Sequence, residues 1–171
     1  MTENNTDKNM KTNIMKTNIK NIIDYLDKSN LTLSFAESCT GGMLTSMFID
    51  IPGISTYLNE GLVTYSNNSK IKRLGVKAST IEKYGAVSEE CVKEMLLGLE
   101  DDVSAATSGI AGPSGGSPEK PVGTVYIGVK VKDSMNIVRK LFKGNRLEIR
   151  QKSCEETINL LLKQLKKKDS R

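Results

Sequence analysis

Histidine is absent from this chain of 171 residues. Its absence excludes a Ser-His-Asp triad, a Cys-His nucleophile pair and every zinc or iron site that depends on histidine ligands. An enzyme with this sequence must therefore use lysine, tyrosine, aspartate or glutamate as its general base. Cysteine is scarce as well: Cys39, Cys91 and Cys154 are far apart and odd in number, which predicts neither a metal site nor a disulfide framework.

Long apolar runs are also missing. No segment approaches the roughly 18 apolar residues that a transmembrane helix needs, and the polar N-terminus lacks the apolar core of a signal peptide. We therefore predict a cytoplasmic protein with no membrane partner. The apolar share of 37% and the charged share of 26% are typical of a globular chain. Length and composition predict a disordered polar tail over residues 1–13 and a single domain over 14–171.

The formal net charge of +5 is compatible with a nucleic-acid partner. However, only three Phe and five Tyr are available for base stacking, and no nucleic-acid-binding motif is present. Cations at the C-terminal end of a helix also suit the negative pole of its dipole. We therefore predict a solvated helix end and no nucleic-acid partner. Much of the excess charge lies in Lys163, Lys166, Lys167, Lys168 and Arg171.

The order of the predicted elements indicates an α/β fold. Apolar residues at helical spacing predict helices, and short apolar runs between them predict strands. Asp133-Ser134 separates two of these strands and indicates a terminal β-hairpin. Because strands alternate with helices up to that hairpin, we predict a three-layer α/β/α sandwich around a mostly parallel sheet with one antiparallel strand. The expected helices cover about 14–28, 43–51, 67–74, 80–84, 88–100 and 147–167, and the expected strands about 32–36, 58–65, 103–108, 122–132 and 135–143.

Serine and glycine follow the first predicted strand, at the edge of the sheet where ligands bind in open α/β folds. Ser38 stands where a nucleophile would be expected in the strand-to-helix turn 36–42. Thr40, Gly41 and Gly42 lie at the start of the next helix, where free N–H groups can bind an anion or an oxyanion. The alternative is that Ser38 or Thr40 only caps the helix.

A second glycine-rich segment, 108–117, follows the third predicted strand. Its backbone amides could cradle a phosphate or an oxyanion, although its spacing does not match the dinucleotide-binding fingerprint. The alternative is a flexible surface connection. Long loops in compact domains are often functional, which favours a binding role. The candidate residues are Ser108, Gly109, Ile110, Ala111, Gly112, Gly115 and Gly116.

Three further residues are candidates for a site that contains no histidine. Tyr65 closes the second strand, and Lys70 follows within the next turn. A lysine near Ser38 could act as a base if desolvation or a neighbouring cation lowers its pKa, and a tyrosine could relay the proton. Arg146 begins the last helix and could hold a phosphate. The alternatives are surface side chains, with Asn145 as a helix cap.

Six stretches of the sequence together resemble the CinA carboxy-terminal-domain family, whose members include nicotinamide-mononucleotide amidohydrolases. They occur in the family's order and cover the chain from about residue 20 to 165. The resemblance implies an α/β/α fold with a five-stranded mixed sheet. The stretches are AESCTGG (36–42), GLVTYSNNSK (61–70), YGAVSEE (84–90), SGIAGPSGG (108–116), KPVGTVYIG (120–128) and GNRLEIR (144–150).

The resemblance also implies roles for matching residues. Ser38 would attack the carboxamide of nicotinamide mononucleotide, and Lys70 with Tyr65 would activate it and protonate the departing ammonia. Amides near Thr40–Gly42 or Ser108–Gly112 would hold the oxyanion. Arg146, with the Gly109–Gly116 loop, would bind the 5′-phosphate. Water would then release nicotinic acid mononucleotide for NAD synthesis, with no metal or other cofactor, and family members suggest a homo-oligomer.

Two features depart from the family pattern. Many members carry a preceding domain that resembles molybdopterin-binding proteins, which we do not expect in a chain of this length. The family's usual Gly-Asp-Arg is Gly-Asn-Arg here, which removes a negative charge beside Arg146 and leaves Asn145 able to cap the helix. Two alternatives to this hydrolase remain: a non-catalytic nucleotide-binding or competence and DNA-damage partner, and a hydrolase that uses Ser38 on another small amide.

Overall fold

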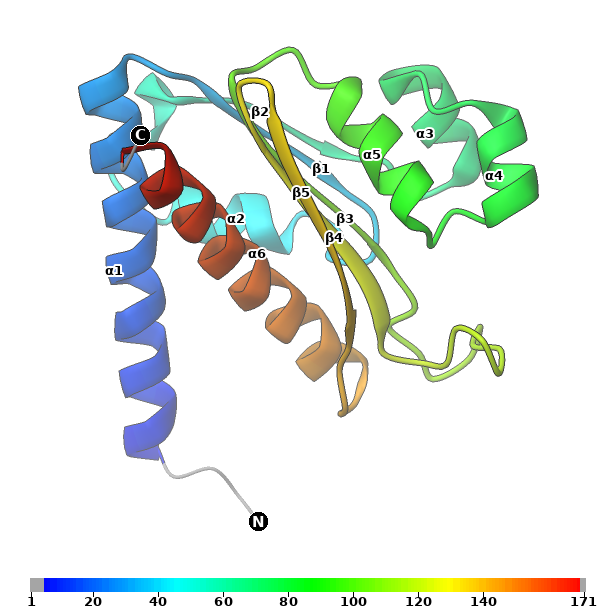
Figure 1. Ribbon diagram of the computed structural model, residues 1–171. Helices are drawn as coiled ribbons and strands as arrows, with labels where there is room; N and C mark the ends of the chain where they lie inside the picture. The colour runs from blue at the N-terminus through cyan, green and yellow to red at the C-terminus, as the bar shows by residue number, and fades with distance from the viewer. Residues whose placement is uncertain (1–4, 170–171) are drawn as a thin grey trace.

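Five strands form a single sheet in the computed structural model, which describes residues 5–169 (Figure 1). Their spatial order is β2-β1-β3-β4-β5, so β1 and β3 lie at the centre. Every residue of β1 is buried, as is all of β3 except its last residue, whereas the edge strand β2 is mostly exposed. The strands are β1 Leu33–Glu37, β2 Leu58–Val63, β3 Val103–Gly109, β4 Thr124–Val131 and β5 Ser134–Leu141.

The sheet is mixed, and the prediction that it is mostly parallel was wrong. β1 pairs in parallel with β2 and β3, but β3–β4 and β4–β5 are both antiparallel. A parallel crossover needs a long connection, usually a helix, and none joins β3 to β4. Instead the chain reverses through 110–123, where the Ile110 amide donates to the Thr124 carbonyl and the Gly123 amide to the Ile110 carbonyl.

The turn between β4 and β5 lies one residue earlier than predicted. Lys132 and Asp133 form it, and Ser134 is already paired with Val131 in the sheet. Lys132 has a φ of 53°, a left-handed conformation that is uncommon outside glycine. Its amide donates to the carbonyl of Asp102, which ties this turn to the start of β3.

Helices cover both faces of the sheet (Figure 1). Apolar side chains of α1, α2 and α6 share one buried cluster with Leu33 and Phe35 of β1. Apolar side chains of α5 share a second cluster with Ala36 of β1 and Ala106 of β3, and α3 and α4 pack beside α5. No helix in residues 5–169 is long and apolar enough to cross a membrane. The helices are α1 Asn5–Ser29, α2 Met43–Ile49, α3 Asn67–Leu74, α4 Ala78–Tyr84, α5 Glu89–Leu97 and α6 Arg146–Asp169, with a short 3-10 turn at Ile54–Thr56.

The first helix begins earlier than composition suggests. Residues 5–13 of the predicted disordered tail belong to α1, and residues 1–4 lie outside the described residues. Ile19, Ile22 and Leu26 anchor the second half of this helix in the core. A helix that is already nucleated extends at little further cost, so a polar segment with little to bury can continue it.

Close packing between α3 and α5 requires glycine at position 98. A Cβ atom at Gly98 would overlap the backbone carbonyl of Leu74, the last residue of α3. We expect Gly98→Ala to lower the free energy of unfolding by about 1–3 kcal/mol, because backbone rather than a flexible side chain must move. Urea unfolding followed by circular dichroism measures this change.

Leu97→Ala is the matched control, since Leu97 is the neighbouring residue and is 61% exposed. Its free energy of unfolding should stay within about 0.5 kcal/mol of wild type. Equal midpoints for Gly98→Ala and wild type would contradict the packing described here.

Candidate active site

The pleat of β1 determines which way the residues at its end face. Side chains alternate between the two faces of a strand, and Phe35 belongs to the cluster under α1, α2 and α6 whereas Ala36 belongs to the cluster under α5. Glu37 therefore faces α2, and Ser38 faces the side of α3–α5. The Ser38 amide donates to the carbonyl of Thr107 at 3.0 Å, which extends the pairing of β1 with β3 by one residue.

Lys70 meets Ser38 on this face of the sheet. Ser66 caps the start of α3, its hydroxyl accepting from the Ser69 amide, and Lys70 follows in the first turn. The Lys70 side chain is only 1% exposed. Its Nζ lies 2.9 Å from Ser38 Oγ. It also donates to the backbone carbonyls of Thr64 at 2.8 Å and Tyr65 at 3.3 Å.

Burial lowers the pKa of the Lys70 amine below its ordinary value, because the charged form loses hydration, while the thiols of Cys91 and Cys39 act in the opposite direction. Among the described residues no carboxylate forms an ion pair with this amine. A neutral amine has two N–H donors and one lone pair. The carbonyls of Thr64 and Tyr65 can take the two donors, which leaves the lone pair to accept the Ser38 hydroxyl proton.

A cavity of about 190 Å³ opens above the Ser38–Lys70 pair. It brings together residues that are far apart in the sequence, from the ends of β1, β2 and β3 and from the starts of α3 and α6. Of the predicted residues, Ser38, Tyr65, Lys70, Ser108, Gly109, Ala111 and Arg146 line this cavity, whereas Thr40, Gly41, Gly42, Ile110, Gly112, Gly115 and Gly116 do not.

Tyr65 contributes its two ends to different parts of the site. Its backbone carbonyl accepts from Lys70, but its hydroxyl accepts a hydrogen bond from Arg146 at 2.9 Å. Arg146 also donates to the carbonyl of Gly112 at 2.8 Å. The arginine thus links the end of β2 to the 110–123 loop across the mouth of the cavity. The Tyr65 hydroxyl is therefore bonded to Arg146 in this arrangement, while Tyr65 lines the same cavity as Ser38 and Lys70.

The start of α2 differs from the expected anion site. Gly41 and Gly42 have φ values of 59° and 89°, which give the sharp turn into the helix. The Gly42 amide already donates to Glu37, and the Thr40 hydroxyl is bonded to that of Thr107 at 2.8 Å. Arg150, from the second turn of α6, donates to the Thr40 carbonyl at 2.7 Å. These groups hold the turn in place rather than line the cavity.

Glu37 is a functional candidate that the sequence patterns missed. Its carboxylate is fully buried and accepts from the amides of Gly42, Leu44 and Thr45 at 2.9, 3.1 and 2.8 Å. It also accepts from the Thr45 hydroxyl at 2.6 Å. A carboxylate at a helix N-terminus is stabilised by these donors and by the helix dipole. Glu37 lies five residues before Gly42, outside the usual capping window, so local spacing did not reveal it.

The amide of Gly109 faces the space beyond the end of β1. Ile110 N–H donates to Thr124 on the β4 side, and directions alternate along a strand, so the N–H of Gly109 is directed to the opposite side. On that side Thr107 already pairs with Ser38, and β1 has ended. Gly109 also lines the cavity, so its amide is a candidate donor for the site.

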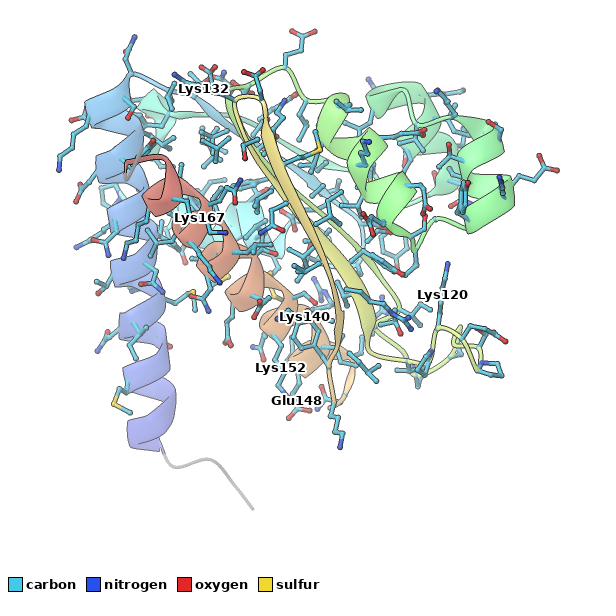
Figure 2. All side chains as sticks on the ribbon, in the orientation of Figure 1. Lys120, Lys132, Lys140, Glu148, Lys152 and Lys167 are labelled. Atoms are coloured by element: carbon cyan, nitrogen blue, oxygen red, sulfur yellow. The ribbon has the colours of Figure 1, made fainter. Side chains whose placement is uncertain are left out.

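The connection between α4 and α5 forms a wall of the cavity that the sequence patterns did not reveal. Ala86 and Val87 line the cavity, and the Ser108 hydroxyl donates to the Ala86 carbonyl at 2.7 Å. Lys120 reaches from the 110–123 loop and donates to the Tyr84 carbonyl at 2.7 Å (Figure 2). The stretch YGAVSEE is one of the six that resemble the family, but its contact with Ser108, 22 residues away in the sequence, forms only in the folded chain.

Cys39 and Asn145 have structural roles near the site. Burial raises the pKa of the Cys39 thiol to about 11, so this thiol is protonated at neutral pH and packs in the core. Asn145 caps α6, as predicted: its side-chain oxygen accepts from the Glu148 amide, and the Glu148 carboxylate accepts from the Asn145 amide. Figure 2 shows Glu148 at the start of this helix.

A sequence profile of the CinA C-terminal domain matches residues 15–165. The chain belongs to this family. A CinA-like protein of Fusobacterium nucleatum subsp. nucleatum is 54% identical over 143 residues, which cover 84% of this chain and 36% of that protein. A CinA-like protein of Petrotoga mobilis is 53% identical over 136 residues, which cover 77% of this chain and 34% of that protein. The chain spans about a third of the length of these curated relatives.

Solved structures of CinA proteins share the fold. A CinA superfamily protein from Klebsiella pneumoniae 700603 is 30% identical with a TM-score of 0.84, and the match covers 88% of this chain and 97% of that one. The competence/damage inducible protein CihA from Agrobacterium tumefaciens is 33% identical with a TM-score of 0.83, covering 86% of this chain and 93% of that one. The family resemblance seen in the six motifs is therefore confirmed.

The buried lysine predicts how the stability of this CinA-family domain depends on pH. Because burial lowers the pKa of Lys70, the unfolded chain binds more protons than the folded chain between that lowered value and the ordinary value of about 10.4. The free energy of unfolding contributed by this site therefore rises with pH across that window. We expect the difference between wild type and Lys70→Met to shift in favour of wild type as pH rises toward the ordinary lysine value of about 10.4. Urea unfolding at several pH values tests this, and a pH-independent difference would contradict it.

Proposed function

We propose that this protein is an amidohydrolase that converts nicotinamide mononucleotide into nicotinic acid mononucleotide and ammonia, within pyridine-nucleotide salvage. The observation that carries the proposal is the contact of 2.9 Å between Lys70 Nζ and Ser38 Oγ at the base of a cavity. A buried lysine beside a serine hydroxyl is a base–nucleophile pair that needs no histidine. The resemblance to the CinA carboxy-terminal-domain family supports the choice of substrate.

In the first step, the neutral Lys70 amine takes the proton of Ser38 while Oγ attacks the carboxamide carbon of the substrate. The Thr64 and Tyr65 carbonyls hold the two remaining N–H groups, so the lone pair faces the hydroxyl. The carboxamide oxygen becomes an oxyanion in the tetrahedral intermediate. The Gly109 amide, directed into this space, is the donor we assign to that oxyanion.

Collapse of the intermediate breaks the carbon–nitrogen bond. The protonated Lys70 returns the proton to the departing amine, which leaves as ammonia, and the nicotinoyl group remains on Ser38 as an ester. Water then attacks the carbonyl carbon of this ester while Lys70 takes a proton from it. The bond between the carbonyl carbon and Ser38 Oγ breaks, Lys70 returns the proton to Oγ, and the product leaves as nicotinic acid mononucleotide, whose carboxylic acid ionises in water. This cycle returns both Ser38 and Lys70 to their starting protonation states.

The size of the cavity supports binding of one end of a nucleotide. About 190 Å³ is below the range of roughly 300–1,000 Å³ that encloses drug-sized ligands. The pyridine ring with its carboxamide would occupy the cavity, and the ribose phosphate would extend to the mouth. Arg146 lies at this mouth, and its planar guanidinium suits a phosphate.

The decisive experiment follows ammonia and nicotinic acid mononucleotide during incubation with nicotinamide mononucleotide. We expect turnover by wild type and a loss of about 1,000-fold or more in Ser38→Ala and Lys70→Met, because nucleophile and base act as a unit. Absence of product at micromolar wild-type enzyme would sink the substrate assignment and favour a non-catalytic nucleotide-binding or competence-associated role. Turnover that survives Ser38→Ala would sink the mechanism alone.

Arg146 should act on substrate binding more than on chemistry. We expect Arg146→Met to raise KM for nicotinamide mononucleotide about tenfold or more with a smaller change in kcat, because it removes the charged partner of the phosphate. Steady-state kinetics measures both constants. Lys143→Met, which removes an exposed cation near the same helix start, is the control and should leave KM within about twofold. Equal KM values for the two variants would contradict a phosphate site at Arg146.

A further inference from the structure

Glu37 and Ser38 are neighbours in the chain but serve opposite faces of the sheet. The Ser38 side chain reaches Lys70 on the α3 side, and the Glu37 carboxylate reaches the start of α2 on the other. The turn that carries Ser38 therefore begins at a residue whose side chain is fixed. We propose that Glu37 is a positioning residue for Ser38: it fixes the distance between Ser38 Oγ and Lys70 Nζ.

The carboxylate is bonded at both oxygens. One oxygen accepts from the amides of Gly42 and Leu44, and the other accepts from the amide and hydroxyl of Thr45. These four hydrogen bonds run from the last residue of β1 to the first turn of α2. Residues 38–41 span the gap between two points that the same carboxylate holds together.

Thr45 connects this arrangement to the edge of the sheet. A Cβ atom at Gly61 of β2 would overlap the Thr45 side chain, so β2 packs directly against it. β2 leads to Thr64 and Tyr65, whose carbonyls orient the Lys70 amine. The carboxylate of Glu37 therefore helps to position both members of the pair. It positions Ser38 through the turn and Lys70 through Thr45 and β2.

Arg150 holds the same turn from α6. It donates to the Thr40 carbonyl at 2.7 Å, and its guanidinium lies 3.6 Å from the position of a Cβ atom at Gly41. The turn is thus held at Thr40 by Arg150 and at Gly42 by Glu37. Small displacements of a reacting group, of about 1 Å, can lower a rate about 100-fold, so these contacts bear on the rate rather than on substrate affinity.

The test measures Ser38 reactivity with a small fluorophosphonate, because this probe requires no nucleotide site. Ser38 Oγ attacks phosphorus, the phosphorus–fluorine bond breaks, fluoride leaves and Lys70 takes the proton. We expect Glu37→Gln to lower the labelling rate about 10- to 100-fold, because an amide cannot accept all four hydrogen bonds. Steady-state kinetics with nicotinamide mononucleotide should show an equal loss in kcat with KM within about twofold.

Glu94→Gln is the matched control for a general loss of stability. Glu94, a residue of α5, also accepts at a helix start, from the Lys77 amide and the Thr80 hydroxyl of α4, both at 2.8 Å, and it does not line the cavity. Its labelling rate should equal that of wild type. Glu37→Gln that is folded by circular dichroism but labels within twofold of wild type would overturn the proposal.

Thr45 provides a second route if Glu37→Gln does not fold. Thr45→Val is nearly isosteric and removes only the hydroxyl bond to Glu37, and it should lower labelling about three- to tenfold. Thr45→Ser restores the hydroxyl and should recover the rate; equal rates for the valine and serine variants would overturn the proposal.

The inference rests on the proposed function only through Ser38 as nucleophile. Labelling that depends on Glu37 in a protein without turnover would overturn the substrate assignment and leave this inference standing.

Discussion

A lysine amine removed from water is the constraint on which the site depends. An ammonium group in this position is costly, because no carboxylate in the described part of the chain pairs with it. The neutral amine avoids that cost, and the hydroxyl of Ser38 and the carbonyls of Thr64 and Tyr65 satisfy its hydrogen-bonding groups. The same burial lowers the pKa of Lys70, and in the proposed mechanism this amine takes the role of base in a chain that lacks histidine.

The mixed sheet brings the other groups to this amine. β1 and β3 are parallel, so their carboxyl ends reach the same edge of the sheet. Ser38 and Ser108 therefore both line the cavity at this edge. The reversal at 110–123 then sends β4 back antiparallel and leaves the Gly109 amide directed beyond the end of β1. Had a helix joined β3 to β4, this loop and its contact with Arg146 would not lie over the cavity.

The site is held from both faces of the sheet. On the α3–α5 side, α3 supplies Lys70 and the connection before α5 supplies Ala86 and Val87. On the other side, Glu37 holds the start of α2, and Arg150 of α6 holds the turn between them. Ser38, which lines the cavity, and Glu37, which holds the turn that carries Ser38, therefore face opposite layers although they are adjacent in the chain.

Local sequence determined much of this. The missing histidine limited a general base to lysine, tyrosine, aspartate or glutamate, and the positions of Ser38 and Lys70 after predicted strands made them candidates before any contact was known. The spacing of apolar residues also located most helices and strands, because it indicates which side of a segment is buried. Strand direction after β3, the four bonds of Glu37 and the contact of Tyr65 with Arg146 were decided by the tertiary structure alone. Each depends on partners outside the local pattern or far along the chain, and periodicity carries no information about such partners.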